Sequence, residues 1–154
     1  MAVRKPLVIV NGQVERLQPG DRLDLSRSVT KNNNTGNTLV AGTPVIVNGG
    51  NAVKAQANSQ SNAKVAGFVA EDAADASPVE VQTEGILTLT TTAWDNVTGQ
   101  TGGLTEGATY YLSALAAGML TTVSPDDHGD YVVGLGRALS TTEFEIEVGA
   151  PIKL

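Results

Sequence analysis

The sequence contains no cysteine and few aromatic residues, and each absence excludes a class of protein. Without cysteine, the 154 residues can form neither a disulfide framework nor a thiolate metal site. Aromatic residues make up 4% of the chain, so the core must be built mainly from aliphatic side chains. The apolar run near the N-terminus stops at Asn11, too early for a signal sequence or a membrane span. We therefore expect a protein that is soluble and intracellular when made, with no membrane partner.

Positive charge is also scarce, and most of it lies near the N-terminus. The chain carries 10 basic and 16 acidic residues, which gives a net charge of −6. Residues 1–31 contain six of the ten basic residues, and the rest of the chain is strongly acidic. An acidic body repels phosphate groups, so we expect no nucleic-acid partner. The basic segment suits either an acidic protein surface or simple solvation.

Short runs of β-branched residues between glycine, asparagine and proline recur along the chain, and no segment keeps a helical period for three turns. Asn11-Gly12 lies between two apolar runs and is typical of a tight hairpin turn. A single helical turn is predicted in "TTAWDNVTG", with Thr92 as its N-cap and Gly99 as its stop. The predicted fold class is all-β: a small β-sandwich or barrel-like body with an extended N-terminal arm.

One pattern, L-x-x-G followed by an apolar triplet, occurs twice. It begins at Leu39 in "LVAGTPVIV" and at Leu104 in "LTEGATYYL", 65 residues later. Further along, the same comparison matches Gly67 with Gly134. We hypothesise two related β units, and the alternative is a chance similarity among valine, alanine and glycine.

These patterns divide the chain into three parts. Residues 1–31 form a basic N-terminal arm that contains the first hairpin. The asparagine-rich residues 32–38 form a linker. Residues 39–154 form the β body, in which the two hypothesised units cover residues 39–90 and 104–154.

Residues suited to catalysis or metal binding are few. The single histidine, His128, lies beside aspartates in "SPDDHGD", a stretch typical of an exposed polar turn and unlike a calcium-binding loop. The chain has no motif of a serine hydrolase. Glu143, Glu145 and Glu147 alternate as on the water-facing side of a strand. We expect no enzymatic activity, no cofactor and no metal site.

The few aromatic side chains allow two interpretations. In a small β protein they usually belong to the core or to a subunit interface, but grouped on a surface they can bind sugars. The residues concerned are Trp94, Tyr110, Tyr111 and Tyr131.

The succession "LVAGTPVIV", "AKVAGFVAEDAADASPVEVQTEGILTL", "GGLTEGATYYLSALAAGMLTT" and "YVVGLGRALSTTEFEIEVGAPIKL" resembles the small capsid cement, or head decoration, proteins of tailed bacteriophages. The likeness covers most of the chain from residue 5. It implies a β-rich, usually homotrimeric structural protein without catalytic residues. Such a protein is made in the host cytoplasm, binds the major capsid protein on the outer surface of the virion head, and bridges neighbouring capsomers.

The opening "KPLVIVNGQVERLQPGD" also resembles N-terminal segments of phage tail-fibre and baseplate components. A component of that kind, binding glycans on the host surface, is the alternative function. For the cement protein, we expect the arm to add a strand to a capsid sheet and to rest on an acidic shell. The predicted capsid-contacting residues are Arg4, Lys5, Arg16, Arg22 and Arg27.

Overall fold

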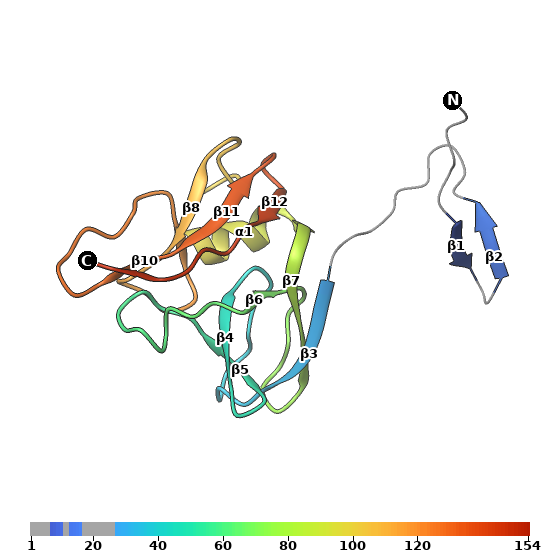
Figure 1. Cartoon of the computed structure of the whole chain (residues 1–154), viewed down its shortest axis with the longest axis horizontal. Helices are drawn as coiled ribbons and strands as arrows, with labels where there is room; N and C mark the ends of the chain where they lie inside the picture. The colour runs from blue at the N-terminus through green and yellow to red at the C-terminus, as the bar shows by residue number, and fades with distance from the viewer. Residues whose placement is uncertain (1–6, 11–12, 17–26) are drawn as a thin grey trace.

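The computed structural model describes residues 7–10, 13–16 and 27–154, and these residues form an all-β protein, as the sequence predicts. The one helix of the described residues, α1, has eight residues and is not long enough to cross a membrane. In chain order (Figure 1) the elements are β1 (Leu7–Val10), β2 (Gln13–Arg16), β3 (Arg27–Asn33), β4 (Pro44–Asn48), β5 (Asn51–Lys54), β6 (Gly67–Val69), β7 (Pro78–Thr88), α1 (Thr91–Thr98), β8 (Thr109–Leu112), β9 (Leu120–Thr121), β10 (Tyr131–Val132), β11 (Gly134–Ala138), β12 (Glu143–Ile146) and β13 (Ile152–Lys153).

The hairpins form at the turn residues that the sequence indicates. β1 and β2 pair antiparallel with Val10 opposite Gln13, which confirms the hairpin predicted around Asn11-Gly12. β4 and β5 pair in the same way around Gly49 and Gly50, which both have positive φ angles. A two-residue turn of this kind needs positive φ at both positions, and glycine adopts it without a steric penalty.

Five strands of the body close into a small barrel. β3 pairs with β5 on one side and with β7 on the other, and β4 and β6 complete the ring (Figure 1). A barrel of so few strands is narrow, so its interior accommodates only small side chains. Those that fill it are Leu39, Val45, Ala52, Val69, Ala73, Val79 and Val81.

An open sheet extends from the end of the barrel. The last residues of β7 pair with β12, and β11, β8 and β9 follow in that order. In the first unit β3 closes the barrel, and in the second unit α1 lies at the corresponding place. The helix contacts β9 at one end of the sheet. At the other end, the indole of Trp94 donates a hydrogen bond to the carbonyl oxygen of Thr142, just before β12. A helix therefore covers the second sheet in the position where a strand completes the first.

The two units share one strand order. β5-β4-β6-β7 in the first unit corresponds to β9-β8-β11-β12 in the second, and β7 pairs with β12 at the junction. The hydrogen bonds correspond as well: Leu39 N–H donates to the carbonyl of Ala73, and Leu104 N–H donates to that of Thr141. Both leucines are buried, and each starts a unit as the repeated pattern predicts.

Beyond the first strand, the structural alignment of the units differs from the sequence alignment. Val45 lies opposite Gly67 in the first unit, and Tyr110 lies opposite Gly136 in the second. Gly67 therefore corresponds to Gly136, and its predicted match with Gly134 is wrong by two residues. The cause is an irregularity in the pairing of β11 with β8, between Gly134 and Gly136.

Glycine is required at the two corresponding positions because a neighbouring strand passes too close for a side chain. A β-carbon on Gly67 would collide with the carbonyl oxygen of Gln82, and one on Gly136 with that of Glu145. Gly136 also has a φ of +145°, which side-chain-bearing residues rarely adopt. The two units thus repeat a close approach of the backbone as well as a strand order.

The body begins earlier in the chain than the sequence predicts. β3 starts at Arg27, inside the predicted arm, and extends into the predicted linker 32–38. Asn33 is completely buried, where its amide donates to the carbonyl of Ala73 and its side-chain oxygen accepts from Thr35. The asparagine-rich segment is part of the body because its polar side chains form hydrogen bonds with backbone groups of the segment and of Ala73. The amino-acid composition alone does not reveal these contacts.

α1 ends where the sequence predicts but begins earlier. Gly99 follows the helix in the left-handed conformation, with φ 68°. The N-cap is Thr90 and not Thr92: the Thr90 hydroxyl accepts a hydrogen bond from Ala93 N–H. Trp94, in the first turn of the helix, is buried.

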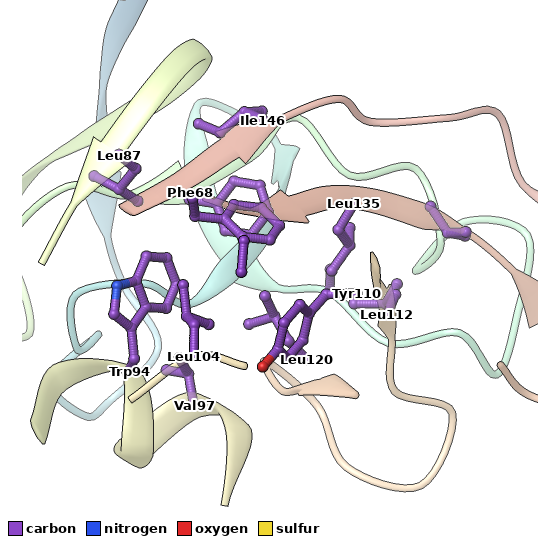
Figure 2. Packing of buried hydrophobic residues seen from close by; sticks show 14 of the residues in the cluster. Phe68, Leu87, Trp94, Val97, Leu104, Tyr110, Leu112, Leu120, Leu135 and Ile146 are labelled. Atoms are coloured by element: carbon purple, nitrogen blue, oxygen red, sulfur yellow. The ribbon is translucent and has the colours of Figure 1, made fainter. Parts of the chain in front are cut away.

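A cluster of aromatic rings joins the two units. The ring of Phe144 lies 5.4 Å from that of Phe68, 5.6 Å from Trp94 and 5.9 Å from Tyr110, measured between centroids. Phe68, Trp94 and Tyr110 reach this cluster from three different segments (Figure 2). Phe68 comes from the barrel, and its neighbour Val69 faces the barrel interior. β6 is therefore buried on both faces, and the larger of the two core clusters spans both units.

Substituting the close-approach glycine tests the structural alignment. We predict that Gly136→Ala lowers the free energy of unfolding by about 1–3 kcal/mol, because the new β-carbon meets the Glu145 carbonyl at an unfavourable φ. Gly134→Ala is the matched control, since a β-carbon there has no neighbour within 4 Å. Urea unfolding measures both, and equal effects at the two positions would contradict the alignment.

Candidate interaction surface

Two of the basic residues predicted to contact a capsid belong to described strands. Arg16 ends β2, and Arg27 begins β3. The Arg27 guanidinium lies 3.6 Å from the carboxylate of Glu84, and both side chains are well exposed, so their ion pair contributes little to stability. Three further predicted residues lie outside the described residues: Arg4, Lys5 and Arg22.

The aromatic side chains belong mainly to the core. Trp94 and Tyr110 are completely buried. The hydroxyl of Tyr110 donates to the side-chain oxygen of Gln100 and accepts from Thr105 N–H, so its polar end is satisfied internally. Tyr111 and Tyr131 remain partly exposed, and they lie on different strands. Of the two interpretations, the core is correct for Trp94 and Tyr110, and neither ring is available to stack on a sugar.

His128 lies in the exposed loop between β9 and β10. Among residues 7–10, 13–16 and 27–154, no three histidine, aspartate or glutamate side chains are placed to hold one metal ion. The loop is held at its base by Tyr131 N–H, which donates to the carbonyl of Ala57. Its shape is therefore determined by backbone contacts with the body.

A hollow of about 150 Å³ lies between the β8–β9 hairpin and this loop. Leu115 and Val123 line it and are 90% and 73% exposed. The tip of the hairpin is held by Ser113, whose hydroxyl accepts hydrogen bonds from two following N–H groups. We refer to this feature as the acidic hollow, because the remaining lining includes Asp126, Asp127 and Asp130.

The C-terminal strand lies beside the acidic hollow. β13 pairs with β10, Leu154 N–H donates to the carbonyl of Asp130, and Gly129 N–H donates to the carbonyl of Leu154 (Figure 1). Ile152 on this strand is 64% exposed. Leu115 and Val123 are thus exposed together at the hollow, and Ile152 is exposed on the strand paired with β10. Grouped exposed apolar side chains are typical of a surface that binds another protein.

The carboxylates of the acidic hollow are not neutralised by the described part of the chain. Among the described residues, ion pairs join Arg27 to Glu84 and Arg137 to Glu145, and neither pair involves a residue that lines the hollow. An arrangement of apolar side chains edged by unpaired carboxylates can bind a segment that is itself apolar and basic.

Sequence reasoning missed the acidic hollow because the hollow combines a hairpin tip with a loop. "SPDDHGD" was recognisable as a polar turn, but nothing in the sequence places that turn beside Leu115. One feature of the sequence does indicate an exposed apolar surface. Leu115 and Val123 lie in turn-forming stretches, where no alternating strand pattern accounts for them.

Comparison with known proteins assigns no family: no family model matches the chain, and no curated protein matches it significantly.

Tryptophan fluorescence tests the burial of the aromatic side chains. Trp94 is the only tryptophan and is 0% exposed, so we predict blue-shifted emission and weak quenching by acrylamide. Cell-surface oligosaccharides should leave the spectrum unchanged, because the indole is packed on Phe144 and hydrogen-bonded to Thr142. Emission typical of a hydrated indole, or a shift on adding sugar, would revive the sugar-binding interpretation.

Proposed function

We propose that the chain is a capsid cement protein of a tailed bacteriophage. As a homotrimer, it binds the major capsid protein on the outside of the head and bridges neighbouring capsomers. The observation that carries this proposal is the succession of β motifs that resembles head decoration proteins, from "LVAGTPVIV" to the C-terminal "EIEVGAPIKL".

The internal use of polar side chains supports a static binding role. Every buried side-chain nitrogen or oxygen of the described residues has a hydrogen-bond partner. Asn33 forms hydrogen bonds with Ala73 and Thr35. Tyr110 forms hydrogen bonds with Gln100 and Thr105. Satisfied interiors of this kind specify one rigid shape, which suits a protein that must match a repeated surface.

The distribution of charge supports attachment through the N-terminal segment. Because β3 belongs to the body, the basic residues that precede the body are Arg4, Lys5, Arg16 and Arg22. A trimer presents three such segments, and their individually weak contacts with a shell reinforce one another. Part of this attraction is electrostatic and is weakened by salt.

The burial of Trp94 and Tyr110 favours the cement protein over a glycan-binding tail component. A sugar-binding surface needs exposed aromatic faces, and these two rings lie in the core. The binding experiment must therefore measure binding to phage heads and to phage tails separately.

Truncation before β3 tests the proposal. Deleting residues 1–26 should leave a cooperatively folded body, because β3 and its pairing with β7 are retained. Deleting residues 1–31, in contrast, would remove most of a barrel strand. We predict that the 1–26 truncation binds purified phage heads at least tenfold more weakly than the full chain in cosedimentation, which corresponds to about 1.4 kcal/mol or more.

A full-length variant provides the control for this truncation. Arg4→Glu combined with Lys5→Glu should weaken head binding and reduce its salt dependence, whereas Arg137→Glu, on the body, should not. Undiminished binding by the truncated chain, or binding of the full chain to tails but not to heads, would contradict the proposed function.

A further inference from the structure

We propose that the acidic hollow holds the N-terminal segment, residues 1–17, of a neighbouring copy of this chain, and so links the copies head to tail. This inference rests on the homotrimer of the proposed function and adds the contact that forms it.

The hollow has the size of a site for one or two side chains. Its volume of about 150 Å³ is well below the roughly 300 Å³ at which pockets for small-molecule ligands begin. Leu115 and Val123 present their apolar surfaces beside it and are almost fully hydrated in a single chain. Aliphatic side chains of a docking strand would bury both and fill the space between them.

The N-terminal segment matches the hollow in polarity and in charge. Residues 1–17 contain the apolar run Leu7–Val10 and carry a net charge of +2, from Arg4, Lys5 and Arg16 against Glu15. The hollow presents aspartate carboxylates that form no ion pair within the described residues. Charge complementarity of this kind selects the partner and sets the orientation of docking.

The position of β3 favours a neighbouring copy as the source of the segment. β3, which begins at Arg27, lies on one side of the body, and β10 and the C-terminus lie on the other (Figure 1). The loop that lines the acidic hollow leads into β10. The first strand of the body therefore lies away from the hollow of the same chain. A contact between two different surfaces of the same chain closes into a ring when the rotation permits, and three copies make such a ring.

Docking on a neighbour leaves part of the segment available to a capsid. The acidic hollow has room for only one or two side chains. The rest of the segment can then contact the shell. Loss of the segment would then weaken head binding in two ways, by removing direct contacts and by separating the trimer.

Engineered cysteines test the contact directly, because the natural chain contains none. Chains carrying Val8→Cys are mixed with mass-tagged chains carrying Val123→Cys and oxidised without any phage particle present. A disulfide requires the two α-carbons to approach within about 7 Å, so we expect a mixed dimer on a non-reducing gel. Glu106→Cys, at an exposed position elsewhere on the body, replaces Val123→Cys in the control and should give none.

Three results would overturn the inference. The mixed dimer fails to form, or it forms equally well with Glu106→Cys. Alternatively, a single chain carrying both Val8→Cys and Val123→Cys gives only an internally linked monomer, which would assign the hollow to the segment of its own chain.

Charge reversal provides a test without cysteine. Asp126→Lys with Asp127→Lys should raise the dissociation constant for self-association at least tenfold in light scattering, because it repels the basic segment. Glu71→Lys with Glu106→Lys makes the same change in net charge at exposed positions away from the hollow, and should leave self-association within about twofold. Equal effects of the two pairs would contradict a specific contact.

The two proposals fail in distinguishable ways. Chains that form the mixed dimer but do not sediment with heads would contradict the cement function and support the inference. Chains that sediment with heads but form no mixed dimer would contradict the inference and leave the function standing.

Discussion

The packing of Phe144 against Phe68, Trp94 and Tyr110 is the interaction on which the rest of the structure depends. The barrel alone encloses only seven small side chains, too few to stabilise an independent domain. By placing Phe68 on its outer face, the barrel contributes to the core of the second unit, so the two units share this cluster. Four of the six aromatic residues of the chain meet in this one cluster.

This use of the aromatic residues determines what is left for recognition. With Trp94 and Tyr110 inside, the described surface offers mainly aliphatic side chains, charges and strand edges, besides the partly exposed Tyr111 and Tyr131. These gather at the ends of the body: the basic segment precedes β3 at one end, and Leu115 and Val123 lie beside carboxylates at the other. Complementary ends of this kind are suited to assembly, and both the inferred ring and the proposed cement function make use of that polarity.

Local features of the fold could be predicted from the sequence, whereas features that depend on distant contacts could not. The all-β class, the first hairpin and the end of α1 at Gly99 follow from turn residues and alternation, which act over a few positions. The burial of Asn33 depends on Ala73, forty residues away, and the match of Gly67 with Gly136 depends on an irregular pairing. The acidic hollow was unpredictable for the same reason, since only the folded chain brings Leu115 to its loop.

The central claim is that this chain binds the outer surface of a phage head as a trimer, and an electron cryomicroscopy map of the intact virion tests it most directly. The account predicts threefold density on the outside of the head, at the junctions of capsomers, into which the barrel and the open sheet fit as one body. In that density, the end bearing the acidic hollow should face the N-terminal segment of the adjacent copy. Density for this chain on the tail or baseplate, or monomers separated on the shell, would contradict the account.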